Sequence, residues 1–187
     1  MTAVARLNWG CGEHVLPGWI NSDTKEGPGV DLVCDIRQGL PLADDSIDYA
    51  VSIHALPEVP YPDLLPVVRE LRRVLKPGGV LRLALPDLER AFAAYRRGDR
   101  DFFLVADEEW RDVGSKLVVQ LVWYGYSRTP FVSGFVRELL EKAGFVDVTQ
   151  LAYGQTASPF PEIVDLDNRE RESLFVEARK SGPIHPG

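Results

Sequence analysis

Glycine, aspartate and histidine residues recur in this sequence directly after short apolar runs. In chain order they are Gly10-Cys11-Gly12, Asp23, Asp35, His54 and Asp87. Glycine lets the backbone approach a ligand closely, because it has no Cβ and tolerates positive φ. A carboxylate accepts hydrogen bonds from a ribose diol or an adenine amino group, and histidine is the usual general base near neutral pH. The pattern indicates a nucleoside-like ligand beside a group that can move a proton.

The apolar runs themselves are predicted strands. They cover residues 4–9, 19–22, 30–34, 47–53 and 80–85, and each is nearly continuous in apolar character. Such runs are typical of strands that are covered on both faces of a sheet. In an open parallel sheet, ligands bind beyond the carboxyl ends of the strands. We therefore expect the glycine turn, the three aspartates and the histidine to meet at one edge of the sheet.

The remaining elements complete an α/β pattern. Helical spacing of apolar residues predicts helices over residues 63–75, 87–97 and 133–143, ended by Pro77-Gly78-Gly79, Gly98 and Gly144. Two further strands are predicted over 145–151 and 173–178. The loop between these strands contains Ser158-Pro159-Phe160-Pro161, so they should pair antiparallel as a hairpin. The elements together predict a Rossmann-like, doubly wound, mostly parallel seven-stranded sheet with an antiparallel C-terminal hairpin.

Length, charge and cysteine content narrow the class of protein. The 187 residues predict one domain over 1–181, with a disordered tail over 182–187. Cys11 and Cys34 make no disulfide framework, and no Cys/His cluster has the spacing of zinc ligands. The net charge of −7 argues against nucleic acid as the main partner. A signal peptide and any run of about 18 apolar residues are absent, so we expect a cytoplasmic protein without membrane insertion. The oligomeric state is left open.

Two cofactor classes use a glycine turn after a first strand. A dinucleotide site requires G-x-G-x-x-G, with helix amides around the pyrophosphate. Here Val15 stands where the third glycine would be, and Glu13 would lie beside the diphosphate. A cofactor with a positive sulfonium and no phosphate fits the acidic rim better. Roughly ten residues separate Gly12 from Asp23, too few for a crossover helix, so we expect about one turn there and a more exposed cofactor loop.

Six segments carry a resemblance to a known family. LNWGCG resembles the first motif of the class I S-adenosylmethionine-dependent methyltransferases. The further segments, which resemble the small bacterial branch of that family, are GWINSD, DLVCDIRQGLPLADDSIDYAVSIHAL, RELRRVLKPGGVLRLALPD, RELLEKAGFVDV and DNRERESLFVEARK. The single GxG is a weak signal. The ordered set at compatible spacings is a strong one, and it covers nearly the whole chain.

The resemblance implies a function and a set of cofactor-binding residues. It implies S-adenosyl-L-methionine as cofactor and a small-molecule acceptor, such as a hydroxyl of a sugar, glycolipid or secondary metabolite. Gly10 and Gly12 would line the methionine end, Asp23 would hold the ribose hydroxyls, and Asp35 with Ile36 would hold adenine. The full set of predicted cofactor-binding residues is Asn8, Trp9, Gly10, Cys11, Gly12, Asp23, Asp35, Ile36 and His54.

Other residues are candidates for the acceptor side and for catalysis. The aromatic-rich segment 101–128 lies where related enzymes place acceptor-binding elements. Trp123, Tyr124 and Tyr126 are predicted to border the acceptor pocket. His54 is either a catalytic base or a histidine satisfied by the backbone. Asp87 either contacts the acceptor as a catalytic residue or caps a helix.

One departure from the family keeps other functions open. Many relatives have Leu-Glu-His after the fourth strand, where this chain has Leu56-Pro57-Glu58. A non-catalytic, S-adenosylmethionine-binding regulatory protein is therefore the main alternative. An NAD-dependent or nucleotide-sugar enzyme is a weaker alternative, because the third glycine is missing.

Overall fold

The computed structural model describes residues 4–182. In this part of the chain, seven strands form one sheet in the order β3-β2-β1-β4-β5-β7-β6. The strands are β1 (Arg6–Trp9), β2 (Ile20–Asp23), β3 (Leu32–Val33), β4 (Ile47–Ile53), β5 (Leu75–Pro86), β6 (Phe145–Leu151) and β7 (Ser173–Lys180). Strands β1 to β5 pair in parallel, whereas β7 runs antiparallel to both β5 and β6. The predicted fold class is confirmed.

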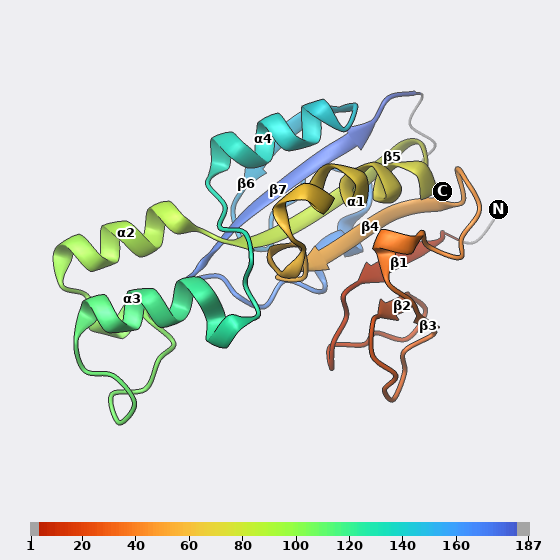
Figure 1. Cartoon of the computed structure of the whole chain (residues 1–187). Coiled ribbons are helices and arrows are strands. Elements are labelled where there is room, and N and C mark those ends of the chain that lie inside the picture. Colours follow the sequence, from red (N-terminus) through yellow and green to blue (C-terminus); the bar gives the residue numbers. More distant parts are fainter. Residues whose placement is uncertain (1–3, 183–187) are drawn as a thin grey trace.

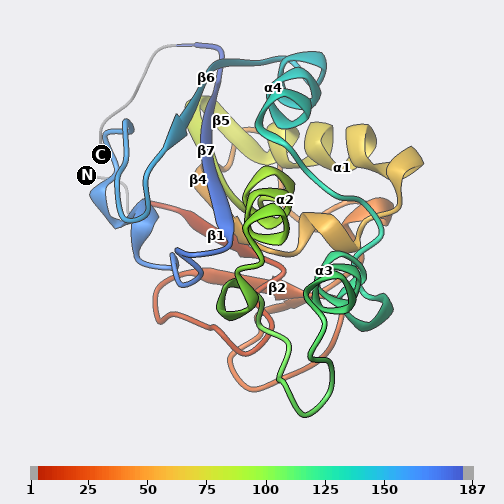
Figure 2. The same ribbon diagram turned by 90° about the vertical axis from the view of Figure 1, so that its left-hand side faces the viewer.

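The helices lie on one face of the sheet and beyond one of its edges. They are α1 (Tyr61–Val74), α2 (Leu88–Arg97), α3 (Val113–Val122) and α4 (Ser133–Lys142). Helices α1 and α4 cover one face, and α2 and α3 lie side by side beyond the carboxyl ends of the parallel strands (Figure 1). Seen from that edge, the segment 152–172 lies on the face opposite α1 and α4 (Figure 2). There Phe160 and Trp19 pack against the buried ring of Tyr49, with ring centroids 4.9 and 5.3 Å apart.

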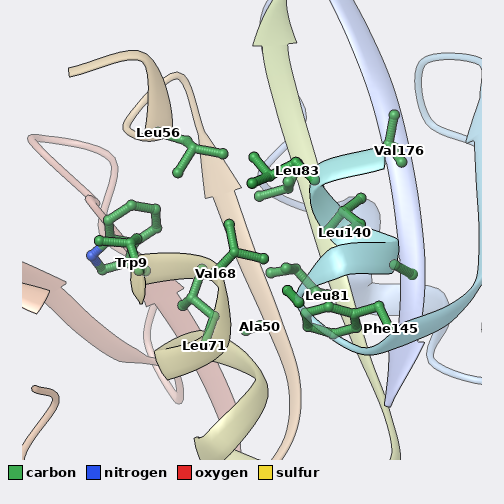
Figure 3. Close-up of a cluster of buried hydrophobic side chains, with 14 of the residues drawn as sticks. Trp9, Ala50, Leu56, Val68, Leu71, Leu81, Leu83, Leu140, Phe145 and Val176 are labelled. Atoms are coloured by element: carbon green, nitrogen blue, oxygen red, sulfur yellow. The ribbon is translucent and has the colours of Figure 1, made fainter. Parts of the chain in front are cut away.

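The main core lies between the sheet and its covering helices. Helix α1 buries Val68 and Leu71, which lie at helical spacing on one face. Helix α4 buries Leu140 against the same sheet. Figure 3 shows these side chains directed toward Leu81 and Leu83 of the central strand β5. This core holds β4 and β5 rigid, and their carboxyl ends are where the predicted site residues begin.

Two predicted elements differ from the structure. Pro77-Gly78-Gly79 was expected after the helix, but it lies inside β5, which begins directly at Leu75. Gly79 allows this, because a Cβ there would lie 2.9 Å from the carbonyl oxygen of Asp48. Helix α3 was not predicted within the segment 101–128. Its sequence, VGSKLVVQLV, has apolar residues on every side, so it shows little helical periodicity.

The predicted disordered tail covers residues 182–187. Apart from Gly182, it lies outside the described residues. Within residues 4–182, no helix has both the length and the apolar character needed to cross a membrane.

Candidate active site

A cavity of about 1010 Å³ opens at the carboxyl ends of the parallel strands. Its volume lies at the upper end of the roughly 300–1,000 Å³ that is usual for small-molecule sites. All nine predicted cofactor-binding residues line it: Asn8, Trp9, Gly10, Cys11, Gly12, Asp23, Asp35, Ile36 and His54. Trp123 and Tyr126 also line it, from the segment after α3. The sequence therefore predicted which residues share one site, whereas their role in binding stays a prediction.

The glycine loop after β1 is shaped by close packing. Gly10 has a φ of +68°, and its amide donates to the carbonyl of Ser22 at 2.8 Å. A Cβ at this position would overlap the Cβ of Ala55, which follows His54 after β4. The loop and the end of β4 are thus in direct contact. Only glycine satisfies both the positive φ and this close approach.

Asp23 ties the end of β2 to the same loop. Its Oδ2 accepts a hydrogen bond from the amide of Gly12 at 2.9 Å, and its Oδ1 accepts from the amide of Lys25 at 3.0 Å. The carboxylate is nevertheless part of the cavity wall. It can therefore accept further hydrogen bonds from a ligand, because each carboxylate oxygen has more than one lone pair.

The loop from residue 10 to 19 forms turns, as its short length predicted. Gly12, Glu13 and His14 are exposed, as expected for this loop, and two buried asparagines hold it in place. Asn8 donates to the carbonyl of His14 at 2.8 Å and to Oδ1 of Asn21 at 3.0 Å. Asn21 also accepts from the amide of Leu16 at 3.2 Å and donates to its carbonyl at 3.1 Å. Sequence reasoning missed Asn21, although a polar residue within an apolar strand was a usable signal.

Asp35 and Ile36 form the far end of the cavity. Asp35 caps the short 3-10 helix Ile36–Gln38 and pairs with Arg37 at 2.6 Å. The hydrogen bonds from the Arg37 side chain lower the pKa of the Asp35 carboxyl. Ile36 is buried and supplies apolar surface beside this ionised group. The pair can therefore hold a flat heterocycle that has an amino edge.

His54 lies at the end of β4, in the centre of the site. Its backbone has a φ of +59°, and its amide donates to the carbonyl of Ala84 at 2.9 Å. Its Nε2 lies 2.7 Å from the hydroxyl oxygen of Ser173. Burial, and secondarily the charge of Arg169, lower the pKa of His54 to about 3. The imidazole is therefore neutral at neutral pH.

Two predicted residues lie elsewhere. The carboxylate of Asp87 caps α2 by accepting from the amides of Glu89 and Arg90, at 2.9 and 3.3 Å. The structure thus shows the helix cap, and Asp87 is not among the residues that line the cavity. The side chain of Tyr124 is exposed, and its hydroxyl donates to Glu109 at 2.6 Å. Left-handed backbone at Trp123 and Tyr124 turns Tyr124 out of the cavity wall.

The departure at Leu56-Pro57-Glu58 has a structural role. The carbonyl of Pro57 accepts from the amides of Arg128 and Thr129, at 2.8 and 3.2 Å. These bonds fasten the segment after α3 to the end of β4, and so they place Trp123 and Tyr126 at the cavity. Glu58 lines the same wall, and burial, followed by the charge of Asp23, raises the pKa of its carboxyl.

Three further residues of the cavity wall were not predicted from the sequence. Asn168, Arg169 and Glu172 line the cavity from the segment before β7. Arg169 pairs with the buried Glu172 at 3.2 Å. In the sequence, the charged run that contains these residues indicates only the family resemblance. Its position at the site depends on the path of the segment 152–172, which no sequence pattern predicts.

The polar groups that line the cavity distinguish between the two cofactor classes. A diphosphate needs helix amides behind the glycine loop, but residues 10–19 form turns. The rim instead carries carboxylates at Asp23, Glu26 and Asp35, which suit a ribose, an adenine and a positive charge. The close packing at Gly10 leaves the backbone of the glycine loop open to contact with a ligand. These residues fit S-adenosylmethionine and do not fit a dinucleotide.

Comparison with known proteins gives two kinds of match. Residues 14–83 match the family model of the methyltransferase domain. A demethylmenaquinone methyltransferase of Lysinibacillus sphaericus is 30% identical over 132 residues, which are 70% of this chain and 55% of that protein. The chain therefore spans about half the length of this relative.

Solved structures give the fold. A SAM-dependent methyltransferase of Archaeoglobus fulgidus matches with a TM-score of 0.62 and 14% identity, over 96% of this chain and 87% of that one. One of Thermotoga maritima matches with a TM-score of 0.60 and 19% identity, over 97% and 84%. The family resemblance seen in the sequence is confirmed: residues 14–83 match the methyltransferase-domain model, and the chain has the fold of these SAM-dependent methyltransferases.

Proposed function

We propose that this chain, as a class I S-adenosylmethionine-dependent methyltransferase, catalyses methyl transfer to a small-molecule acceptor. One observation supports this most strongly. The glycine loop, Asp23, Asp35 and His54 line one cavity, and the glycine loop continues into turns, with no helix directly behind it to bind a diphosphate. A nucleoside with a sulfonium fits this donor set. The cavity is also large enough to admit an acceptor beside it.

Each part of the cofactor wall has a proposed task. Gly10 and Gly12 would hold the methionine end, where the backbone is open. Asp23 would accept from the ribose hydroxyls, and Asp35 with Ile36 would hold the adenine. The carboxylates at the rim also favour a positively charged ligand over a negatively charged one.

When bound, S-adenosylmethionine supplies an already activated methyl group on a positive sulfur. The protein's own work is then to align the acceptor and to exclude water. Trp123 and Tyr126 cover the acceptor side with apolar surface. The bonds from Arg128 and Thr129 to Pro57 hold this cover against the end of β4.

The acceptor that we propose is a small hydroxylated molecule of the sugar, glycolipid or secondary-metabolite type. Its side of the cavity carries Gln120, Asn168, Arg169 and Glu172, which can hydrogen bond hydroxyl groups. The Lysinibacillus relative is named for demethylmenaquinone. The polar groups on this wall favour a more hydrophilic acceptor than that one, with an aromatic part against Trp123 and Tyr126.

Calorimetric titration with S-adenosylhomocysteine tests the cofactor, with NAD as the competing ligand. We expect S-adenosylhomocysteine to bind and NAD not to bind. Asp23→Asn should weaken the binding about tenfold or more, because a charged hydrogen-bond acceptor is lost. Glu138→Gln, on the exposed face of α4, is the matched control and should leave it unchanged. Binding of NAD alone would refute the proposal.

Methyl transfer is tested with labelled S-adenosylmethionine and four acceptors: 4-hydroxybenzoate, catechol, methyl glucoside and menadiol. If any of the four acceptors is methylated, and if Asp23→Asn lowers the rate, the result supports the proposal that the chain is an enzyme. Binding of S-adenosylhomocysteine without transfer to any acceptor would favour the regulatory alternative.

A further inference from the structure

The imidazole of His54 is fixed by contacts to two neighbouring strands. The backbone amide of His54 donates to Ala84 of β5 at 2.9 Å. Its ring nitrogen Nε2 lies 2.7 Å from Oγ of Ser173, the first residue of β7. Strand β5 lies between β4 and β7 in the sheet. The histidine side chain therefore reaches across the end of β5, at the edge where the cavity opens.

The backbone of His54 is also unusual. A φ of +59° is rare for a residue other than glycine and is unfavourable by itself. Such conformations persist where the surroundings hold them, and they are concentrated at ligand-binding and catalytic sites. At His54 the bonds to Ala84 and Ser173 are the contacts that hold it.

The hydrogen-bond partners of Ser173 determine which ring nitrogen carries the proton. Ser173 is fully buried, at 0% exposure, and within residues 4–182 its hydroxyl has one hydrogen-bond partner, Nε2 of His54. If Nε2 donated, the hydroxyl proton of Ser173 would be buried without an acceptor, which is unfavourable. If the hydroxyl donates, both groups are satisfied. A neutral imidazole carries one proton, so this proton is on Nδ1.

The other nitrogen, Nδ1, is open to the cavity. Within residues 4–182 it has no hydrogen-bond partner, yet it is absent from the fully enclosed, unpartnered side-chain atoms, which are Nε of Arg6, OH of Tyr49 and Oγ of Ser52. It is therefore not fully enclosed, and His54 lines the cavity. An unpartnered N–H on a cavity-lining side chain is thus available to a ligand.

We propose that Ser173 is a positioning residue that holds His54 as the Nδ1–H tautomer, so that His54 donates a hydrogen bond to the acceptor and does not remove its proton. The role toward the acceptor rests on the proposed methyl transfer, whereas the tautomer does not. The low pKa of His54 agrees, because a base that weak takes up little proton near neutral pH.

This assignment narrows the class of acceptor. The acceptor must offer an oxygen lone pair to Nδ1–H, and its nucleophile must ionise without help from His54. Phenols and carboxylates meet both conditions, whereas an aliphatic alcohol does not. Of the acceptor types proposed above, a secondary metabolite with a phenol or a carboxylate is therefore favoured over a sugar or a glycolipid. Among the four acceptors, 4-hydroxybenzoate and catechol should therefore react faster than methyl glucoside.

The tautomer is tested directly by long-range proton–nitrogen NMR of histidine-labelled, ligand-free protein. His54→Asn assigns the His54 signals. We expect Nδ1 protonated and Nε2 unprotonated from pH 5 to 8. Ser173→Ala should convert this pattern to a mixture of tautomers. The matched control is Ser52→Ala on β4, which also removes a buried hydroxyl and should leave the spectrum of His54 unchanged. A proton on Nε2 in the wild type would overturn the proposal, whatever the chain binds.

Turnover of the fastest acceptor separates a donor from a base. The side-chain amide of His54→Asn still carries an N–H donor but cannot accept a proton, whereas His54→Ala can do neither. We expect the kcat/KM of His54→Asn to exceed that of His54→Ala by about tenfold, since one hydrogen bond to the acceptor is kept. Equal losses of about a hundredfold or more would instead indicate a general base and overturn the donor role.

The two proposals fail in distinguishable ways. If S-adenosylhomocysteine does not bind, the proposed function fails, and the tautomer measured by NMR still decides whether Ser173 orients His54. If the cofactor binds and Nε2 carries the proton, only the inference about Ser173 and His54 fails.

Discussion

Gly10 packs directly against Ala55, so closely that a β-carbon on Gly10 would overlap the methyl group of Ala55. This contact joins the glycine loop after β1 to the residue that follows His54. The cofactor side of the cavity and the end of β4 therefore share one packed boundary. A substitution on either side of the boundary should therefore affect the structure of the other side.

Gly10→Ala should abolish cofactor binding. The added methyl group must displace Ala55, and alanine also disfavours the φ of +68°. Calorimetry should show at least about a hundredfold loss of affinity for S-adenosylhomocysteine, equivalent to about 2.7 kcal/mol. Gly18→Ala, in the same loop but outside the cavity lining, is the control, because its φ is also positive, at +80°, but no atom lies within 4 Å of the new methyl group. Similar losses in the two variants would show that the contact with Ala55 is unimportant.

Asn21→Leu should destabilise the protein and loosen the cofactor loop. The side chain is similar in size, but the partners of the amide on Asn8, Leu16 and Asp31 lose their hydrogen bonds. We expect the free energy of unfolding to fall by about 2–4 kcal/mol, because buried groups are left unsatisfied. Chemical denaturation measures this loss.

The control for this prediction is Gln150→Leu, an exposed amide on β6. It should change the free energy of unfolding by less than about 0.5 kcal/mol. If Asn21→Leu cost no more than this control, the loop would be held by something other than the asparagine network.

The sequence predicted the elements whose signals are local. Strands β4 and β6 have the predicted bounds, because the mostly apolar β4 ends at His54 and β6 begins directly after Gly144. The cofactor side of the site followed from the same reasoning, since residues at strand ends must meet in a parallel sheet. The strand assignments alone thus predicted that Asp23 and His54 share one cavity.

The parts that could not be predicted depend on long-range contacts. The segment Pro77-Gly78-Gly79 has the composition of a helix stop, but the residues on either side of it, Leu75 and Val80, pair with β4, and it forms an irregularity within β5. Asp87 and Tyr124 follow suitable elements, yet a helix cap and a left-handed turn direct their side chains away from the cavity. Arg169 reaches the site from a loop whose path is set by contacts far along the chain.

The most buried of those contacts involves Arg82. It is fully buried on β5 and pairs with Asp167 at 2.5 Å and with Glu177 at 2.8 Å. Arg82→Met should lower the free energy of unfolding by about 3–5 kcal/mol, because two buried carboxylates lose their cation. It should also free the segment 152–172, so proteolysis should cut there first.

Neutralising the carboxylates is the second arm of this test. Adding Asp167→Asn and Glu177→Gln to Arg82→Met removes the uncompensated charges. The triple variant should recover part of the lost stability. If it were no more stable than Arg82→Met alone, the loss would come from packing and not from buried charge.

His54 should make the stability of the fold depend on pH. Burial, and then the charge of Arg169, lower its pKa in the folded state to about 3, against an ordinary value of 6.5. Between these values the unfolded chain binds a proton that the folded protein does not bind. The contribution of neutral His54 is therefore complete above about pH 6.5 and is lost as the pH falls toward 3. The slope from this one group is at most about 1.4 kcal/mol per pH unit.

Urea denaturation of the wild type and of His54→Asn between pH 7 and 4 measures this effect. Asparagine does not titrate, so the variant should lose less stability than the wild type as the pH falls. Arg169→Ala is the intermediate case, because it removes the smaller cause of the pKa shift and leaves the burial of His54 in place. Its slope should lie close to that of the wild type. Parallel curves for the wild type and His54→Asn would mean that folding does not lower the pKa of His54, and below its ordinary pKa the protonated Nε2 could then not accept from Ser173.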